Sequence, residues 1–130
     1  MSEKKKILVV DDDELIREAL QLILENTLSL SGCNAAVDCA ASGEEALQKV
    51  RQQKYDAVLM DTQMGGIHGY DVCAQMKEKN PDQVVIGMSM DPTCRQQWID
   101  AGADEFVPKF EFTKSIRDIL TQYLPKDAEK

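Results

Sequence analysis

The sequence has little of the material from which zinc sites, disulfide frameworks and membrane spans are built. Its 130 residues include four cysteines and one histidine, and no two cysteines form a CxxC pair. This argues against a zinc site or a disulfide framework and favours reduced thiols in a cytosolic protein. No apolar run approaches the roughly 18 residues of a membrane span, and the segment Met1 to Lys6 is polar. We therefore expect a soluble, cytoplasmic protein that does not enter a membrane.

Basic residues are few compared with acidic ones. Fifteen lysines and arginines stand against 23 aspartates and glutamates, which gives a net charge of −8. A nucleic acid or an anionic membrane surface would be repelled at long range by this charge. The composition therefore argues against direct nucleic-acid binding by this chain.

The length predicts one domain, because domains most often have roughly 100 to 150 residues. An apolar content of 43% can supply a core for a chain of this size. We expect one domain over residues 1–130, with a core from about residue 5 to residue 124 and a frayed tail at 126–130.

Short apolar runs alternate with longer stretches in which apolar residues recur at helical spacing. The short runs predict strands at Ile7–Val10, Ala35–Ala40, Ala57–Met60, Val84–Met88 and Glu105–Val107. Helix ends are marked by a Ser42–Glu45 capping box, by Asp91-Pro92 and by Gly102. Five βα units of this kind predict an α/β fold with a parallel sheet covered by helices on both faces.

Polar residues follow several of these strands, at the sheet edge where ligands of such folds bind. They are Asp11, Asp12, Asp13, Asp61, Ser89 and Lys109. Any one of them has an ordinary explanation, and Asp13 is assigned as the N-cap of the first helix. Together they place several carboxylates, a hydroxyl and an ammonium at one edge.

Clustered carboxylates repel one another unless a cation lies among them. Magnesium commonly takes one or two carboxylates together with phosphate oxygens, which suits Asp11, Asp12 and Asp61. Lys109 and Ser89 suit a phosphoryl group, as a point charge and a hydrogen-bond donor. A carboxylate can also be the nucleophile that forms an aspartyl phosphate.

At this point the sequence resembles the receiver domain of two-component response regulators. The resemblance runs from Lys5 to about Leu124 and rests on five segments that stand in the family's order and usual spacing. They are KILVVDDDELIR, ASGEEAL, YDAVLMDTQMGGIHGYDV, VVIGMSM and AGADEFVPKF. The resemblance implies a flavodoxin-like three-layer sandwich, doubly wound as (βα)5, with strand order 2-1-3-4-5.

The resemblance also assigns roles to single residues. It implies that Asp61 is the phosphoacceptor, that Asp11 and Asp12 bind magnesium beside it, and that Lys109 binds the phosphoryl group. Ser89 falls on the hydroxyl position of the switch. Phe106 falls on the aromatic position that changes rotamer, and its apolar ring favours a buried resting position.

The implied function is a switch rather than an enzyme with a separate substrate. A histidine kinase or phosphotransfer protein would phosphorylate Asp61 with Mg2+, and the chain would take part in its own phosphorylation and slow dephosphorylation. The output would be a protein-interaction surface on the predicted helix between Asp91 and Gly102, the strand Glu105–Val107 and the helix that follows it, which could serve a downstream partner or a homodimer.

Four features depart from the family pattern. Gly65-Gly66 follows Met64 where proline is usual, which predicts a mobile loop. The order Pro108-Lys109-Phe110 predicts that the usual cis bond after the lysine is absent. Trp98 stands where the family mostly has a small residue. Its predicted role is to fill the core, or else to anchor a binding partner. The segment Thr27 to Asn34 is several residues longer than the usual connection between the first helix and the second strand. It would either extend the first helix, with Gly32 as its C-cap, or form a loop.

Three alternatives remain. A haloacid-dehalogenase-like phosphohydrolase would use Asp11 as its nucleophile, although Glu14 follows the aspartates where Thr or Val is usual. A flavodoxin-like phosphate or flavin binder would need a Ser/Thr/Gly-rich loop after the first strand, where this sequence has three aspartates. A receiver that signals only by protein contact would not need the full set of site residues.

Overall fold

The computed structural model describes residues 5–30, 32 and 35–124. Its main sheet has five parallel strands in the order β2-β1-β3-β6-β7. Because β6 and β7 are the fourth and fifth strands of this sheet along the chain, the predicted order 2-1-3-4-5 is confirmed. The strands are β1 (Lys5–Val10), β2 (Ala35–Ala40), β3 (Ala57–Asp61), β6 (Val85–Ser89) and β7 (Glu105–Pro108).

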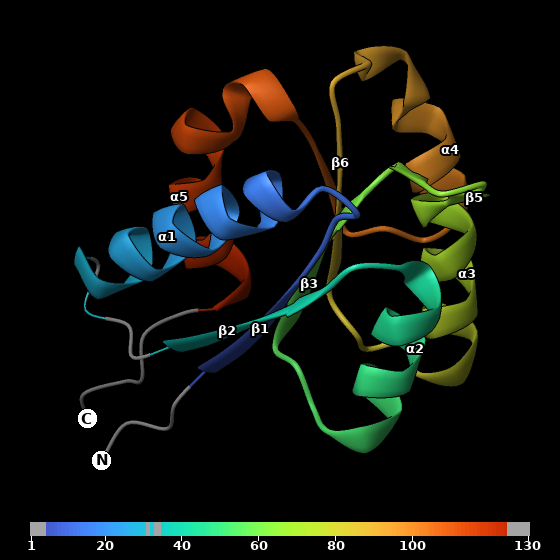
Figure 1. The fold of residues 1–130 in the computed structure, drawn as a ribbon, viewed down its shortest axis with the longest axis horizontal. Helices are drawn as coiled ribbons and strands as arrows, with labels where there is room; N and C mark the ends of the chain where they lie inside the picture. The colour runs from blue at the N-terminus through green and yellow to red at the C-terminus, as the bar shows by residue number, and fades with distance from the viewer. Residues whose placement is uncertain (1–4, 31, 33–34, 125–130) are drawn as a thin grey trace.

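Helices cover both faces of the sheet, as predicted. One face carries α1 (Glu14–Leu30) and α5 (Phe112–Tyr123), and the other carries α2 (Gly43–Gln52), α3 (Gly69–Lys79) and α4 (Arg95–Asp100) (Figure 1). Short 3-10 turns, η1 (Pro92–Cys94) and η2 (Lys109–Glu111), precede α4 and α5. None of the helices formed by the described residues is long and apolar enough to cross a membrane.

Each face of the sheet has its own hydrophobic core, because successive strand residues point to opposite faces. We call them the α1/α5 core and the α2/α3/α4 core. Ile7, Val9 and Leu59 belong to the first, and their neighbours Leu8 and Val10 belong to the second. All five side chains are fully buried.

The helix ends follow the signals in the sequence. The Asp13 carboxylate accepts hydrogen bonds from the amides of Leu15 and Ile16 at 3.0 and 3.4 Å, which confirms Asp13 as an N-cap. Ser42 Oγ accepts from the Glu45 amide at 3.1 Å, and the Asp91 carboxylate accepts from the Thr93 amide at 2.9 Å.

The C-terminus of α4 is closed by Gly102, as predicted. Its φ of +94° lies in the left-handed region that glycine tolerates. The amide of Gly102 donates to Ile99 O, and the amide of Ala103 donates to Trp98 O, each at 3.0 Å. These two bonds satisfy carbonyls that the end of a helix leaves open.

The connection between α1 and β2 begins as helix. Helix α1 continues to Leu30, so the helical alternative for this segment holds that far, and Gly32 follows with φ +80°. Residues 31, 33, 34 and the predicted tail at 126–130 lie outside the described residues.

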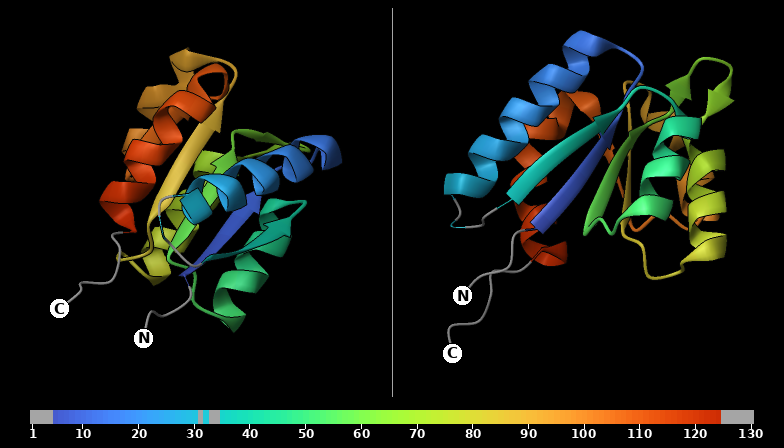
Figure 2. Two further views of the ribbon diagram at one scale, coloured as in Figure 1. Left: turned by 90° about the vertical axis from the view of Figure 1, so that its left-hand side faces the viewer. Right: turned by 60° about the horizontal axis from the view of Figure 1, so that its bottom comes forward.

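The predicted loop at Gly65-Gly66 is the turn of a small hairpin, which sequence reasoning missed. Its strands are β4 (Gln63–Met64) and β5 (Ile67–His68), and it stands beside the start of α3 (Figure 2). Both glycines have positive φ, as the type I′ turn of a two-residue hairpin requires. The mobility of this segment stays a prediction.

Candidate functional site

Four of the sheet strands deliver polar side chains to one edge, as their parallel direction requires. Asp11 follows β1, Asp61 is the last residue of β3, Ser89 is the last of β6, and Lys109 follows β7. No cis peptide bond occurs among the described residues, which confirms the expectation for the turn at Pro108 to Phe110.

Lys109 joins the two central carboxylates. Its Nζ lies 2.8 Å from Asp11 Oδ2 and 3.0 Å from Asp61 Oδ1. The three side chains are shielded from solvent, with exposures of 12% for Lys109, 1% for Asp11 and 13% for Asp61. The structure therefore brings together three residues that lie far apart in the sequence, as the sequence predicted.

Asp12 completes an acidic cluster with Asp11 and Asp61, and one carboxylate oxygen from each lies within 4.8 Å of the others. The Asp12 side chain is exposed, so a hydrated ion can reach the cluster. Asp11 Oδ1 is held by the Asp13 amide at 3.0 Å, and Asp11 O accepts from Arg17 Nη1 at 2.8 Å. Three neighbouring carboxylates, one of them open to water, form a donor set that fits Mg2+.

Burial and charge act in opposite directions at this cluster. Burial raises the pKa of Asp61, and the nearby Asp11 carboxylate adds to this, although Lys109 opposes it. For Lys109, burial favours the neutral amine, but its hydrogen bonds to Asp11 and Asp61 outweigh burial and raise its pKa. The ammonium therefore stays charged. A second positive charge near the carboxylates would reduce the repulsion between Asp61 and Asp11 and favour the ionised form of Asp61.

The two residues assigned to the switch occupy inward positions. Ser89 is 6% exposed, and its Oγ accepts a hydrogen bond from the Asp91 amide at 3.0 Å. Phe106 is 5% exposed in the α2/α3/α4 core, with the Arg95 guanidinium 5.0 Å from the ring centroid. Phe106 is therefore buried, as its apolar ring predicts, and its role in a switch stays a prediction.

Sequence reasoning missed the role of Thr62, which follows Asp61. Thr62 Oγ1 accepts from Trp98 Nε1 at 2.9 Å and donates to Met88 O at 2.7 Å. Trp98 is fully buried, so core filling is the correct one of its two predicted roles. In addition, Trp98 ties α4 to the residue beside the candidate phosphoacceptor.

The signal for this link was a glycine inside an apolar strand. A Cβ on Gly87 of β6 would lie 2.2 Å from Trp98 Cδ2, so the indole ring packs directly on the strand backbone. Glycine at the centre of a strand often marks such a close approach. The sequence VVIGMSM contains that signal, although it does not name the partner.

Asp11 is poorly placed to be a nucleophile. It is 1% exposed, Oδ2 contacts Lys109 Nζ and Oδ1 accepts from the Asp13 amide. Both of its oxygens are thus engaged before any substrate arrives. This geometry speaks against the phosphohydrolase alternative.

Comparison with known proteins gives a family match over most of the chain. The family model of the response regulator receiver domain matches residues 7–121. The transcriptional regulatory protein ResD of Bacillus subtilis is 36% identical over 80% of this chain and 41% of ResD. Response regulator MprA of Mycobacterium leprae is 33% identical over 95% of this chain and 54% of MprA. The chain thus spans about half the length of the curated relatives it matches.

Solved structures show the same likeness. The response regulator protein TrrA of Thermotoga maritima, determined in complex with Mg2+-BeF, has a TM-score of 0.81 and 34% identity, over 92% of this chain and 99% of TrrA. The signal receiver domain of NarL from Mycobacterium tuberculosis has a TM-score of 0.77 and 29% identity, over 92% of this chain and 95% of that one. The comparisons do not support the phosphohydrolase alternative.

Proposed function

Because the chain belongs to the response regulator receiver domain family of two-component systems, we propose that it is a switch that accepts a phosphoryl group on Asp61. The observation that carries this proposal is the position of Lys109, which contacts Asp61 and Asp11 at once. A phosphoryl group on Asp61 would lie close to the Lys109 ammonium and to the carboxylates of Asp11 and Asp12.

The reaction transfers a phosphoryl group from a phosphohistidine to a carboxylate. An Asp61 oxygen attacks the phosphorus, the bond from the histidine nitrogen to phosphorus breaks, and its electron pair stays on the imidazole. Lys109, already beside Asp61, balances charge on the phosphoryl oxygens. Asp61 suits this role better than Asp11, because it is the more exposed of the two and Asp11 has both oxygens engaged.

Asp11, Asp12 and Asp61 would hold the magnesium ion. When bound, Mg2+ neutralises part of the negative charge, which allows an anionic phosphoryl donor to approach three carboxylates. The charge of the cluster supports this assignment, because the described structure places only Lys109 in ion-pair contact with Asp11 and Asp61. Ser89 Oγ, which accepts from the Asp91 amide in this structure, would donate a hydrogen bond to the phosphoryl group.

The output would run through Ser89 and Phe106 to the surface formed by α4, β7 and α5. Phe106 lies on β7, and Arg95 at the start of α4 covers its ring. A shift of Ser89 toward Asp61 would free space for Phe106 and change this surface. The partners we propose are a histidine kinase or phosphotransfer protein as donor, and a downstream protein or a second copy at the output surface. A cytoplasmic location stays a prediction from the sequence.

Intact-mass measurement tests the phosphoacceptor. With acetyl phosphate and Mg2+, we expect the wild-type chain to gain the mass of one phosphoryl group, and the Asp61→Asn variant to gain none. Asp71→Asn, which removes an exposed carboxylate from α3, is the matched control and should be labelled like wild type. Labelling that persists in Asp61→Asn but is lost in Asp11→Asn would contradict the proposal.

A further inference from the structure

A second candidate site lies between α2 and α3, where the two helices enclose a cavity of about 250 Å3. Helices in this fold run back against the strands, and the cavity lies at the C-terminal ends of α2 and α3. It is therefore at the opposite end of the sheet from Asp61. None of the residues assigned to phosphorylation lines it.

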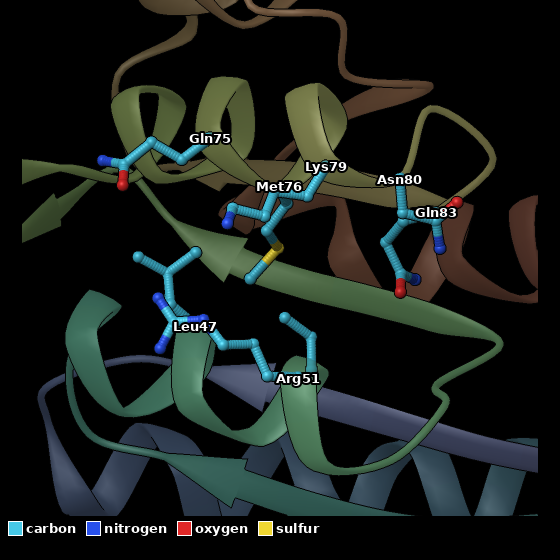
Figure 3. A pocket seen from close by; sticks show the side chains of 8 residues that line it. Leu47, Arg51, Gln75, Met76, Lys79, Asn80 and Gln83 are labelled. Atoms are coloured by element: carbon cyan, nitrogen blue, oxygen red, sulfur yellow. The ribbon is translucent and has the colours of Figure 1, made fainter.

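Most of the inner surface of this cavity is apolar. Met76 points from α3 toward α2 (Figure 3) and is 3% exposed, and Leu47 and Val50 of α2 face it while remaining partly exposed. A methionine is a flexible filler that adapts to different shapes. The cavity thus offers an apolar surface to a small hydrophobic body, and its volume is close to the lower end of the roughly 300–1,000 Å3 typical of ligand pockets.

One wall of the cavity carries a buried amide with an open acceptor. Gln83 is 8% exposed, and its Nε2 donates to Tyr55 O at 3.1 Å and to Val84 O at 3.2 Å. These two carbonyls fix the amide orientation, because a flipped amide would set oxygen against oxygen. No donor among the described residues reaches Gln83 Oε1, and this atom is not sealed from solvent. A ligand that carries an N–H or O–H group could donate a hydrogen bond to Gln83 Oε1.

Two cations stand at the opening. Arg51 from α2 and Lys79 from α3 both line the cavity (Figure 3), and both are exposed. Within the described part of the chain, neither side chain forms an ion pair or a hydrogen bond. The whole chain has a net charge of −8, whereas the charged side chains that line this cavity, Arg51 and Lys79, are both positive. They favour an anionic group on the ligand.

We propose that this cavity binds a small aromatic carboxylic acid that carries an N–H or O–H donor. The ring packs on Leu47, Val50 and Met76, the donor bonds Gln83 Oε1, and the carboxylate faces Arg51 and Lys79. The small volume limits the ligand to one ring or two fused rings. Binding does not depend on phosphorylation at Asp61, so the proposal stands or falls apart from the proposed function.

Indole-3-acetate is a suitable probe, because it combines a fused ring, an N–H donor and a carboxylate. In an amide NMR titration of the wild-type chain, we expect saturable shifts confined to the C-terminal halves of α2 and α3 and to the Gln83 side chain. Naphthalene-1-acetate lacks the N–H and should bind about fivefold more weakly, as expected for one lost hydrogen bond. Indole-3-acetamide lacks the charge and should also bind about fivefold more weakly.

Protein variants separate the local cations from the overall charge. Arg51→Gln combined with Lys79→Gln should weaken indole-3-acetate binding by about fivefold or more. Lys114→Gln combined with Arg117→Gln removes the same charge from α5 and should leave the affinity unchanged. An equal loss in both double variants, an amide that binds as tightly as the acid, or an absence of saturable shifts at this cavity would overturn the proposal.

Discussion

The two cores on either side of the sheet are built differently. The α1/α5 core consists of aliphatic side chains with one methionine and one phenylalanine, and these pack without help from buried hydrogen bonds between side chains. The α2/α3/α4 core contains Trp98, Tyr55 and most of the buried methionines, and Trp98 is hydrogen-bonded to Thr62. The first core resembles a scaffold, whereas the second is joined directly to the residue that follows Asp61.

In the second core, the Trp98 ring also packs directly against the backbone at two glycines. Trp98 packs on Gly87 so closely that a Cβ there would lie 2.2 Å from the ring, and a Cβ on Gly69 would lie 2.0 Å from Asp61 O and 3.0 Å from the same ring. One indole thus contacts β6, the start of α3 and, through Thr62, the end of β3. The cavity between α2 and α3 borders this core too. The comparison shows that a hydrogen-bonded, closely packed link to the residue beside Asp61 exists in the second core and not in the first.

The largest difference should appear when a buried side chain is shortened in each core. Leu24→Ala removes a fully buried side chain from the α1/α5 core and should lower the free energy of unfolding by about 3 kcal/mol. Met76→Ala should cost about 2 kcal/mol, because Met76 already borders a cavity and the space that it leaves joins that cavity. Urea unfolding followed by circular dichroism gives both values. A cost for Met76→Ala that equals or exceeds the cost for Leu24→Ala would contradict this difference in packing between the two cores.

The contact between Gly87 and Trp98 predicts a next-largest effect. Gly87→Ala should lower the free energy of unfolding by about 2 kcal/mol, because the new methyl group overlaps a fully buried ring. In a Trp98→Leu background the same change should cost much less, since the ring is gone. A double-mutant cycle measures this coupling, which we expect to be about 1–2 kcal/mol. Additive costs would show that the ring does not limit residue 87.

The sheet and the main site residues could be predicted because each depends on local patterns. Five apolar runs fix the strands, and polar residues at the strand ends must gather at one edge of a parallel sheet. The bond between Trp98 and Thr62 could not be predicted, because it joins residues 36 positions apart through packing that no local pattern encodes. The hairpin at Gly65-Gly66 was within reach, since a glycine pair between short strands is a known turn signal.

The cavity between α2 and α3 was beyond sequence reasoning for another reason. Leu47, Val50 and Met76 have the spacing of ordinary core residues, and the sequence does not say that their helices leave a gap. The width of that gap depends on how both helices pack on the sheet. Gln83 likewise reads as a loop residue, whereas the structure buries it and fixes its amide on Tyr55 O.

The smallest effect should come from the hydrogen bond that joins α4 to Thr62. Thr62→Val keeps the shape of the side chain but removes the hydroxyl, so the fully buried Trp98 N–H would lose its acceptor and Met88 O would lose a donor. We expect a loss of about 1.5 kcal/mol in the free energy of unfolding, as for a buried donor left unsatisfied. Thr62→Ser keeps the hydroxyl and is the matched control.

Because the chain has a single tryptophan, its one indole N–H resonance reports on this bond without ambiguity. In Thr62→Val that resonance should move upfield and its hydrogen should exchange faster, whereas Thr62→Ser should stay close to wild type. Amides of α4 should lose protection from exchange, while those of α5, on the other face of the sheet, should not change. This contrast follows from where Trp98 lies: it belongs to α4 and to the second core, and α5 packs only in the first. Equal loss of protection in α4 and α5 would mean that the two cores respond as one unit, and the effect of the bond between Thr62 and Trp98 would not be confined to the second core.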